Sequence, residues 1–324
     1  MATYKGIQGY SVQKLSSDPS PTASVEGELW YNSTSGKFKI AVSGAGAWAS
    51  ATAMNTIRTS SGGAGLQAAA IIAGGSIPLP TLNSETYNGS SWAEGTNINT
   101  ARQSIGACGT TTASLIAGGY SGPASTVFGE AEKWDGSSWA EVADLNTDRM
   151  TNNCIVGTST AALCFGGNAP GAVAINETYN GTSWTETANL NTARNGIASL
   201  GTANTAAIAA GGAPSSTESW NGTSWTEVNT LTTPRSYAQG AGAVTSGLVF
   251  GGGGALTEFY NATSWTEMGD LGTGRDQGGG AGGAAGGTAA IAMGGSKPSG
   301  SPVITGLTEE WDDPVYAVKT VTVS

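Results

Sequence analysis

Hydrophobic and polar positions alternate in short runs along this chain, and the runs recur in a fixed order. Residues 102–142 contain four of them, SIGACGT, ASLIAGG, GEAEKWD and SSWAEV, separated by residues typical of turns. None of the runs has the 3.6-residue period of an amphipathic helix, and each has the composition of a short strand. The pattern therefore predicts units of four short strands and no helix.

The third and fourth runs are joined by a nearly invariant turn sequence. ETYNGTSWTE (177–186) recurs as ETYNGSSWAE (85–94), EKWDGSSWAE (132–141), ESWNGTSWTE (218–227) and EFYNATSWTE (258–267). Asn-Gly and Asp-Gly tolerate the positive φ angles of a tight hairpin turn. Each copy is predicted to be the outer hairpin of one sheet.

Three motifs repeat with a common period of 40 to 48 residues. The first is a tryptophan: Trp48, Trp92, Trp139, Trp184, Trp225 and Trp265. The second is an arginine ten residues later: Arg58, Arg102, Arg149, Arg194, Arg235 and Arg275. The third is a Gly-Gly pair that ends an apolar run, at Gly75, Gly119, Gly167, Gly212, Gly252 and Gly295. Six copies of one supersecondary unit indicate a repeat architecture.

Four antiparallel strands per unit, repeated around a ring, predict an all-β fold of the β-propeller type. The last unit ends at EEWDD without a fourth strand, whereas GAWASA (46–51) precedes the first arginine. We therefore predict six four-stranded blades, closed by strands from both termini. The alternative is seven blades, if ELWYN (28–32) and the tail VYAVKTVTVS (315–324) form a blade of their own.

The regions outside the repeats suggest three parts: an N-terminal extension (1–45), the propeller (46–313) and a C-terminal tail strand (314–324). GELWYNSTSGKFKIAVSG (27–44) has turn residues between two alternating runs, which predicts a β-hairpin. We expect this hairpin to be an attachment segment. Its candidate contact residues are Leu29, Trp30, Tyr31 and Phe38.

The composition fits a turn-rich β protein, with 51 glycines and 11% charged residues in 324. The apolar segments are too short to span a membrane, and MATYKGIQGY has no apolar core of a signal peptide. We expect synthesis and folding in a cytoplasm. Cys108, Cys154 and Cys164 are interpreted as small core residues, with a Cys154–Cys164 disulfide as the alternative.

The charge is divided unequally between the regions. Residues 1–44 have a net charge of +1, and 45–324 have −11, which gives the total of −10. An acidic propeller is a poor partner for phosphate backbones, so we expect no nucleic-acid binding. The chain has no histidine, which removes imidazole metal sites and histidine-activated nucleophiles. The sequence predicts neither a metal nor a cofactor.

The periodic charges are interpreted as architecture. Each arginine is matched by a third-strand glutamate, predicted to be Glu85, Glu132, Glu177, Glu218, Glu258 and Glu310. A buried arginine needs carboxylates or carbonyls to offset its desolvation. The periodic tryptophans are predicted to pack one blade on the next. The sequences NGS (88–90) and NGT (180–182, 221–223) match glycosylation acceptors, but hairpin turns already account for them.

The segments after the Gly-Gly pairs vary in length and sequence, unlike the hairpin turns. Variable loops on a rigid repeat scaffold usually carry recognition. Candidate recognition residues are Pro78, Leu79, Tyr120, Phe128, Lys297 and Pro298.

The order of arginine, Gly-Gly, E-x-Y/W and tryptophan over residues 46–313 resembles the kelch repeat, although Trp134, Trp220 and Trp311 replace its tyrosine. The LWYN…GK hairpin and the YNGTSWTE repeats are similar to structural proteins of marine bacteriophages. This resemblance implies a virion component present in many copies, made in a bacterial cytoplasm. Its N-terminal segment would bind other virion proteins, and its propeller would bind a host-surface glycan or a neighbouring subunit.

Two classes of function follow. The first is a non-enzymatic virion protein of the tail-fibre, receptor-binding or decoration type. The second is a glycan-degrading enzyme with paired carboxylates, for which Glu130 and Asp276 are candidates because they are outside the periodic set. A sialidase-like site is not expected, because the chain's six arginines are all periodic and DGSSW (135–139) is one residue short of the sialidase box.

Overall fold

The computed structural model describes residues 12–19, 27–43, 46–122, 125–212, 216–283, 286–297, 303–312 and 316–321. The chain divides into two compact units. Unit 1 consists of residues 1–46 and 314–324, and unit 2 of residues 47–313. The tail strand thus belongs with the N-terminal segment.

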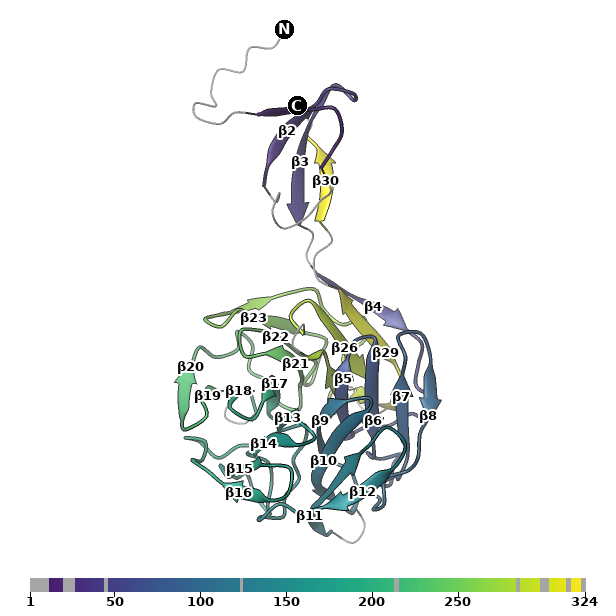
Figure 1. Cartoon of the computed structure of the whole chain (residues 1–324), viewed down its shortest axis with the longest axis vertical. Helices are drawn as coiled ribbons and strands as arrows, with labels where there is room; N and C mark the ends of the chain where they lie inside the picture. The colour runs from purple at the N-terminus through teal and green to yellow at the C-terminus, as the bar shows by residue number, and fades with distance from the viewer. Residues whose placement is uncertain are drawn as a thin grey trace. The chain divides into compact units, whose positions relative to one another are not determined.

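Unit 2 contains six four-stranded sheets arranged around a common centre (Figure 1), which we number as blades 1 to 6. Blades 1 to 3 are β5 (Gly62–Leu66), β6 (Ala69–Ala73), β7 (Ser84–Tyr87), β8 (Trp92–Glu94); β9 (Gly106–Thr110), β10 (Ala113–Tyr120), β11 (Val127–Trp134), β12 (Trp139–Val142); and β13 (Ile155–Thr158), β14 (Ala161–Phe165), β15 (Asn176–Tyr179), β16 (Trp184–Glu186). Blades 4 and 5 are β17 (Ala198–Ala203), β18 (Ala206–Ala210), β19 (Thr217–Trp220), β20 (Trp225–Val228); and β21 (Gln239–Ala243), β22 (Ser246–Phe250), β23 (Thr257–Tyr260), β24 (Trp265–Glu267). Blade 6 is β25 (Gly279–Ala281), β26 (Ala289–Met293), β29 (Thr308–Asp312) and β4 (Ala47–Ala51).

The fold class is confirmed as an all-β propeller. The first strands of the six blades contact one another in a closed cycle, in the order β5, β9, β13, β17, β21, β25 and back to β5. The hairpins form as predicted: Asn180 Oδ1 accepts hydrogen bonds from the backbone N–H groups of Thr182 and Ser183, both at 2.9 Å. Gly181 between them has φ 94°, which a glycine adopts without steric cost.

Blade 6 is closed by strands from both ends of the chain. β29 pairs antiparallel with β4, and Trp311 lies opposite Trp48. GAWASA therefore supplies the missing fourth strand, as its position before the first arginine predicts. A short two-stranded sheet, β27 (Ser296–Lys297) with β28 (Val303–Ile304), extends the loop between β26 and β29.

A seventh four-stranded sheet belongs to unit 1. Its order is β1 (Gln13–Leu15), β2 (Leu29–Asn32), β3 (Lys37–Ser43) and β30 (Tyr316–Thr320), with β1 parallel to β2. The two segments named in the seven-blade alternative do form one sheet, since β2 lies in ELWYN and β30 in the tail. The closed cycle of first strands itself contains the six sheets of unit 2.

The hydrophobic core of the propeller is divided into six clusters, each between neighbouring blades. Every cluster contains the aromatic pair from the third and fourth strands of one blade and inner-strand residues of the preceding blade. In blade 2, Trp134 and Trp139 have ring centroids 5.3 Å apart and pack on Ile71 and Ala73 of blade 1. The periodic tryptophans thus bind blade to blade.

Deleting residues 1–51 should open the ring, because it removes β4 and leaves the edge of β29 unpaired. We expect the cooperative unfolding transition to broaden and its midpoint temperature to fall. Differential scanning calorimetry measures both.

The matched control is deletion of residues 1–45, which keeps β4. That protein should retain a sharp propeller transition. An equal melting profile for the two deletions would show that β4 does not close the ring.

Candidate functional site

Each blade contains one buried arginine paired with a buried glutamate of its own third strand. The partners are Arg58 with Glu85, Arg102 with Glu132, Arg149 with Glu177, Arg194 with Glu218, Arg235 with Glu258, and Arg275 with Glu309. The Arg102–Glu132 and Arg194–Glu218 pairs have N–O distances of 2.7 and 2.9 Å. All twelve residues are buried.

The prediction of Glu310 as the sixth partner is wrong. Arg275 binds Glu309, which lies two residues before Trp311 as Glu85 lies two residues before Tyr87. Successive side chains of a strand point to opposite faces, so only this spacing places the carboxylate on the arginine's side. Glu310 is on the other face of β29 and is half-buried.

The carboxylates also fix the segments that connect the blades. Glu218 Oε2 accepts a hydrogen bond from the backbone N–H of Asn191 at 2.7 Å, three residues before Arg194. Glutamates of the other five blades bind the equivalent N–H at 2.6 to 2.8 Å. The Arg235 guanidinium donates to the backbone carbonyl of Leu256, at 2.6 Å, which anchors the loop before β23. Each ion pair therefore holds two segments in place, the connection before the arginine and the loop before the third strand.

The arginine backbone joins each blade to the one before it. The carbonyl of Arg102 accepts a hydrogen bond from the N–H of Gly75 in blade 1 at 2.9 Å, and the carbonyl of Arg58 accepts one from Gly295 in blade 6. Gly74 and Gly75 have φ of 60° and 93°, and a Cβ on Gly74 would lie 2.8 Å from the Arg102 carbonyl oxygen. The Gly-Gly motif is required by this close approach.

Burial lowers the pKa of five of the six arginines, Arg58, Arg102, Arg194, Arg235 and Arg275. Desolvation lowers the pKa of Arg194, and the Glu218 carboxylate opposes that shift. Arginine nonetheless stays protonated at neutral pH because its ordinary pKa is so high. The guanidinium groups are buried and ion-paired inside the blades, which leaves these arginines unavailable to a ligand.

Glu310 has a different contact, at the junction of blades 6 and 1. Tyr87 has its pKa raised to about 12, by burial first and by its hydrogen bond to Glu310 second. Gln67 of blade 1 donates a hydrogen bond to the backbone carbonyl of Trp311 at 2.8 Å. These side chains therefore link blade 1 directly to the closing blade.

A ring of strained residues lies at the inner end of the connecting segments. At one equivalent position in each blade the residue has positive φ: Ser60 (56°), Ser104 (58°), Asn152 (44°), Gly196 (64°), Tyr237 (58°) and Gln277 (54°), and in blade 3 the next residue, Asn153 (67°), has it as well. Their backbones bond from blade to blade, with Ser104 N to Ser60 O and Tyr237 N to Gly196 O both at 2.7 Å. Such φ values cost energy, and here each blade supplies one of these residues.

Asn153 interrupts the symmetry of this ring. Ile155 of blade 3 pairs with Cys164 at the position where Ala107 of blade 2 pairs with Ile116. Blade 3 therefore has one residue more than blade 2 between its arginine and this position of the first strand. The side chain of Asn153 donates to the carbonyl of Gly278 in blade 6 at 2.8 Å. Blades 3 and 6 lie on opposite sides of the ring, so Asn153 crosses the axis. The longer spacing after Arg149 is visible in the sequence, but we did not predict its consequence.

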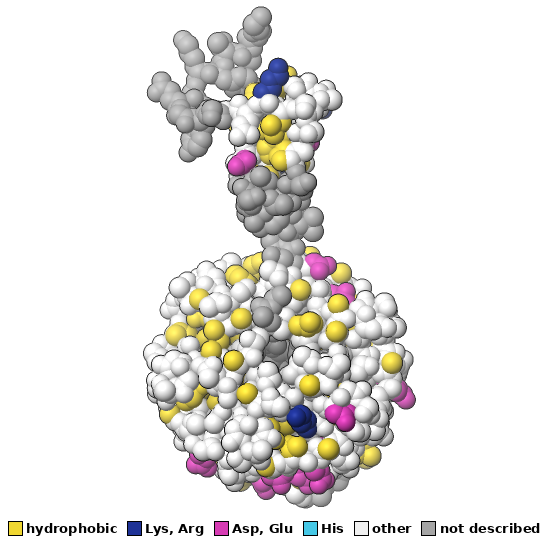
Figure 2. Space-filling model, viewed as in Figure 1, with side chains coloured by type: hydrophobic (Ala, Val, Ile, Leu, Met, Phe, Trp, Pro, Cys, Tyr) yellow, Lys and Arg dark blue, Asp and Glu magenta, His cyan; other side chains and the backbone are white. Residues whose placement is uncertain are grey.

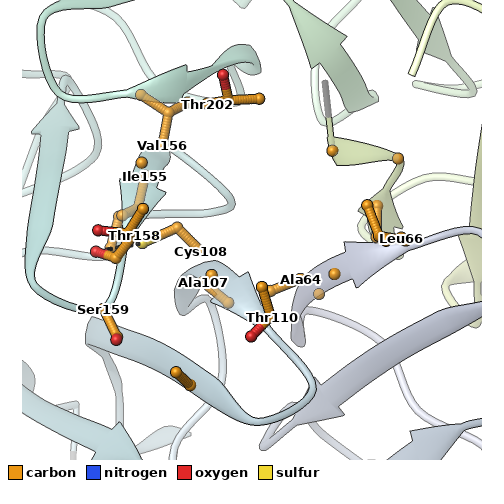
Figure 3. Close-up of a pocket in the computed structure, with 18 of the residues that line it drawn as sticks. Ala64, Leu66, Ala107, Cys108, Thr110, Ile155, Val156, Thr158, Ser159 and Thr202 are labelled. Carbon is orange, nitrogen blue, oxygen red and sulfur yellow. Dashed lines mark hydrogen bonds between the residues drawn. The ribbon is translucent and has the colours of Figure 1, made fainter. Parts of the chain in front are cut away.

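A central cavity of about 790 Å³ is lined by the first strands of all six blades. Figure 3 shows Ala64 and Leu66 on one side of this space and Val156 and Thr202 on the other. Asn153 lines it, as do Lys133 and Asp135 from a hairpin of blade 2. Thr110, Thr158 and Thr202 are exposed, so hydroxyl groups lie around the cavity. The lining is otherwise mainly Gly and Ala.

The two carboxylates named for the enzyme alternative do not line this cavity. Glu130 Oε2 lies 3.8 Å from Arg102, and Asp276 accepts a hydrogen bond from the Ser296 hydroxyl. Asp135 is the one acidic residue in the described lining. Hydrogen bonds from Ser138 N–H and then Ser137 lower its pKa to about 2, opposite to the raised pKa of a general acid. No cluster of three metal-binding side chains occurs among the described residues.

The candidate recognition residues have different environments. Pro78 and Leu79 lie in the exposed loop of blade 1, with Leu79 60% exposed. The prediction that Tyr120 and Phe128 are in a loop is wrong, because the pairing of β10 with β11 extends to Tyr120 and Val127. Lys297 is half-buried in β27, and Pro298 lies outside the described residues.

The candidate attachment residues lie in the sheet of unit 1. Trp30 is 2% exposed, and its indole N–H donates to Asp18 Oδ1 at 3.0 Å. Tyr31 and Phe38 make an edge contact with centroids 5.3 Å apart and are half-buried, as is Leu29. Trp30 therefore belongs to the core of the sheet, and the other three are accessible to a partner.

The cysteines are buried and free. The alternative of a Cys154–Cys164 disulfide is wrong. Burial raises the pKa of the Cys154 thiol to about 12, so these residues are unreactive core side chains. No described segment is a helix long and apolar enough to span a membrane.

The fold has counterparts among solved structures, although no family model and no curated protein matches the sequence. The structure of YjhT aligns with a TM-score of 0.64, over 79% of this chain and 95% of that chain. Sequence identity is 13%. At this identity the likeness concerns the fold, and it supports a β-propeller.

Replacing Arg194 with Ala should lower the free energy of unfolding by about 3–5 kcal/mol, because Glu218 would be left buried and unpaired. Replacing both, as Arg194→Met with Glu218→Leu, should recover part of this loss. Urea denaturation of Arg194→Ala, of the single variants Arg194→Met and Glu218→Leu, and of the double variant measures these changes. Additive losses would contradict a coupled pair.

Tyr87 should ionise near pH 12 in the folded protein, two units above an ordinary tyrosine. Its contribution to stability is complete below about pH 10 and is lost as the pH rises through 12, because the neutral phenol is the form that burial and Glu310 favour. The absorbance change lost in Tyr87→Phe identifies this titration. The control Glu310→Gln should lower the pKa. A titration of Tyr87 at pH 10 in the folded chain would refute the contact.

Proposed function

We propose that this chain is a non-enzymatic structural protein of a bacteriophage virion, of the tail-fibre, receptor-binding or decoration type, with a kelch-type propeller. The supporting observation is the contrast between the two ends of the blades. Five hairpin turns share one Asn or Asp turn sequence, whereas the loops after the Gly-Gly pairs differ in length and composition. A scaffold with one constant and one variable end is suited to recognition.

The variable loops lie on one face, together with the connections between blades. We call this surface the variable face and define it as the loops between second and third strands, such as 76–83 and 121–126. Thr59 forms a bridge with Ser76, and Gln103 with Tyr120, so connections and loops meet there. Pro80 would be 3.0 Å from a Cβ on Gly122. The loops of blades 1 and 2 therefore adjoin.

The chemistry of the variable face favours a neutral ligand. Leu79 and Val303 are 60% and 54% exposed, and Ile57 in the connection that leads to blade 1 is 48% exposed. The propeller's six arginines are buried in ion pairs, and its two lysines are Lys133 and Lys297. On the one face of the propeller that Figure 2 shows, Lys and Arg side chains are sparse and hydrophobic side chains are scattered. An uncharged host-surface glycan, or a neighbouring subunit, fits this composition.

A non-enzymatic role is supported by the central cavity. Glycoside cleavage by the usual mechanism needs two carboxylates with separated pKa values. The described lining offers Asp135 alone, and its hydrogen bonds hold it ionised. Hydrogen bonding by backbone and threonine groups can bind a ligand but supplies no acid or nucleophile.

Unit 1 is proposed as the attachment segment. Its described sheet has three lysines on β1 and β3, Lys14, Lys37 and Lys39, whereas the propeller is acidic. The difference in charge is consistent with different partners for the two units. Multiple copies per particle follow from a structural role, and the proposed location is the virion.

Attachment and recognition should be separable by mutation. Replacing loops 76–83 and 121–126 with the short loop 252–256 should alter binding to host cells and leave the amount of protein in purified particles unchanged. The double substitution Leu29→Asp, Phe38→Asp should abolish incorporation, since charge would replace the accessible apolar side chains of unit 1.

Quantitative mass spectrometry of purified particles counts the protein for each variant, and calorimetry of the propeller transition confirms folding. Lys37→Gln on the same hairpin is the matched control for unit 1 and should incorporate normally. Full incorporation of the double variant, or its loss with the loop exchange alone, would contradict this division of roles.

A further inference from the structure

One antiparallel register pairs the two ends of the chain in both units. In unit 1, β3 pairs with β30, and Lys39 lies opposite Thr320. In unit 2, β4 pairs with β29, and Ala51 lies opposite Thr308. The residue numbers of a pair have the same sum in both ladders, because three residues of the sequence separate β3 from β4 and three separate β29 from β30.

We infer that β30 acts as the closing strand of unit 1, so that unit 1 is folded only when this strand, which follows the whole propeller in the chain, is in place. β30 is essential to unit 1 because the core of unit 1 is small. Trp30 and Ala41 are the buried hydrophobic residues in its described part. Ala41 lies on β3 directly opposite Val318 of β30.

Removal of β30 would leave β3 as an edge and expose Ala41. A sheet of so few residues is marginally stable even with all its strands. The propeller has no such dependence, since β29 and β4 pair within blade 6 and contact blades 5 and 1. The two units therefore differ in how much stability they derive from β30.

This arrangement makes unit 1 the last part of the chain to fold during synthesis. β1 to β3 emerge first, but their partner β30 emerges after the whole propeller. A chain that ends early has no completed unit 1. If unit 1 attaches the protein to the virion, a consequence that rests on the proposed function, incorporation is restricted to full-length chains with a closed ring.

The test compares two variants of the full chain, each with a single proline, at neighbouring positions of β30. Val321 N donates a hydrogen bond to Phe38 O at 3.0 Å. Alternate residues of an antiparallel strand bond to the same neighbour, so Lys319 N–H also faces β3 and Thr320 N–H faces the free edge. Lys319→Pro removes a ladder hydrogen bond, whereas Thr320→Pro removes none.

Hydrogen exchange measured by mass spectrometry reports on each unit separately. For Lys319→Pro we expect the amides of peptides in 27–43 to exchange at least ~10-fold faster than in the wild type. Thr320→Pro should leave them near the wild-type rate. Peptides of the propeller should be unchanged in both and show that the variants are folded. If Lys319→Pro is insoluble, Val321→Pro removes the neighbouring hydrogen bond at the end of the strand.

Unchanged exchange in 27–43 for Lys319→Pro would overturn the inference, as would equal acceleration by both prolines. Incorporation into particles is measured in parallel. Fast exchange in 27–43 with normal incorporation would support the closing strand and refute the attachment role of unit 1. Fast exchange with lost incorporation supports both.

Discussion

The buried arginine of each blade is the group on which the propeller depends. Its guanidinium binds the third-strand glutamate of its own blade, and its backbone carbonyl binds the Gly-Gly turn of the preceding blade. Removing such a charge from water is costly, and the ion pair with the glutamate and the contacts with backbone carbonyls offset this cost. One arginine in each blade thus holds three features in place: the Gly-Gly turn of the preceding blade, the connecting segment, and the interface between the two blades.

The same constraint explains why much of the fold could be predicted from sequence. A period-2 pattern with a fixed turn identifies a hairpin, and a missing strand at one terminus predicts closure by the other. Errors arose where the pattern was locally ambiguous. In EEWDD either glutamate could pair with Arg275, and only the two-residue spacing to Trp311 selects Glu309. Tyr120 was assigned to a loop because strand length depends on pairing, which the sequence does not display.

Contacts across the ring, and the cavity beside them, cannot be predicted from the sequence. The spacing after Arg149 shows an additional residue, but that Asn153 reaches Gly278 follows from the closed six-fold geometry. The cavity beside it likewise results from six first strands meeting at one centre. The six strands can meet there only with small side chains, so the Gly and Ala lining has a steric explanation and does not itself indicate a ligand. We therefore propose recognition on the variable face.

Units counted from arginine to tryptophan coincide with blades 1 to 5, whereas blade 6 combines strands from both ends of the chain. The two strands that close the ring, β29 and β4, thus lie at the ends of the repeat array. Unequal recombination between near-identical copies would therefore add or remove a whole unit and leave both closing strands intact. Blade number can change in evolution in a single step, while the means of closing the ring is inherited unchanged.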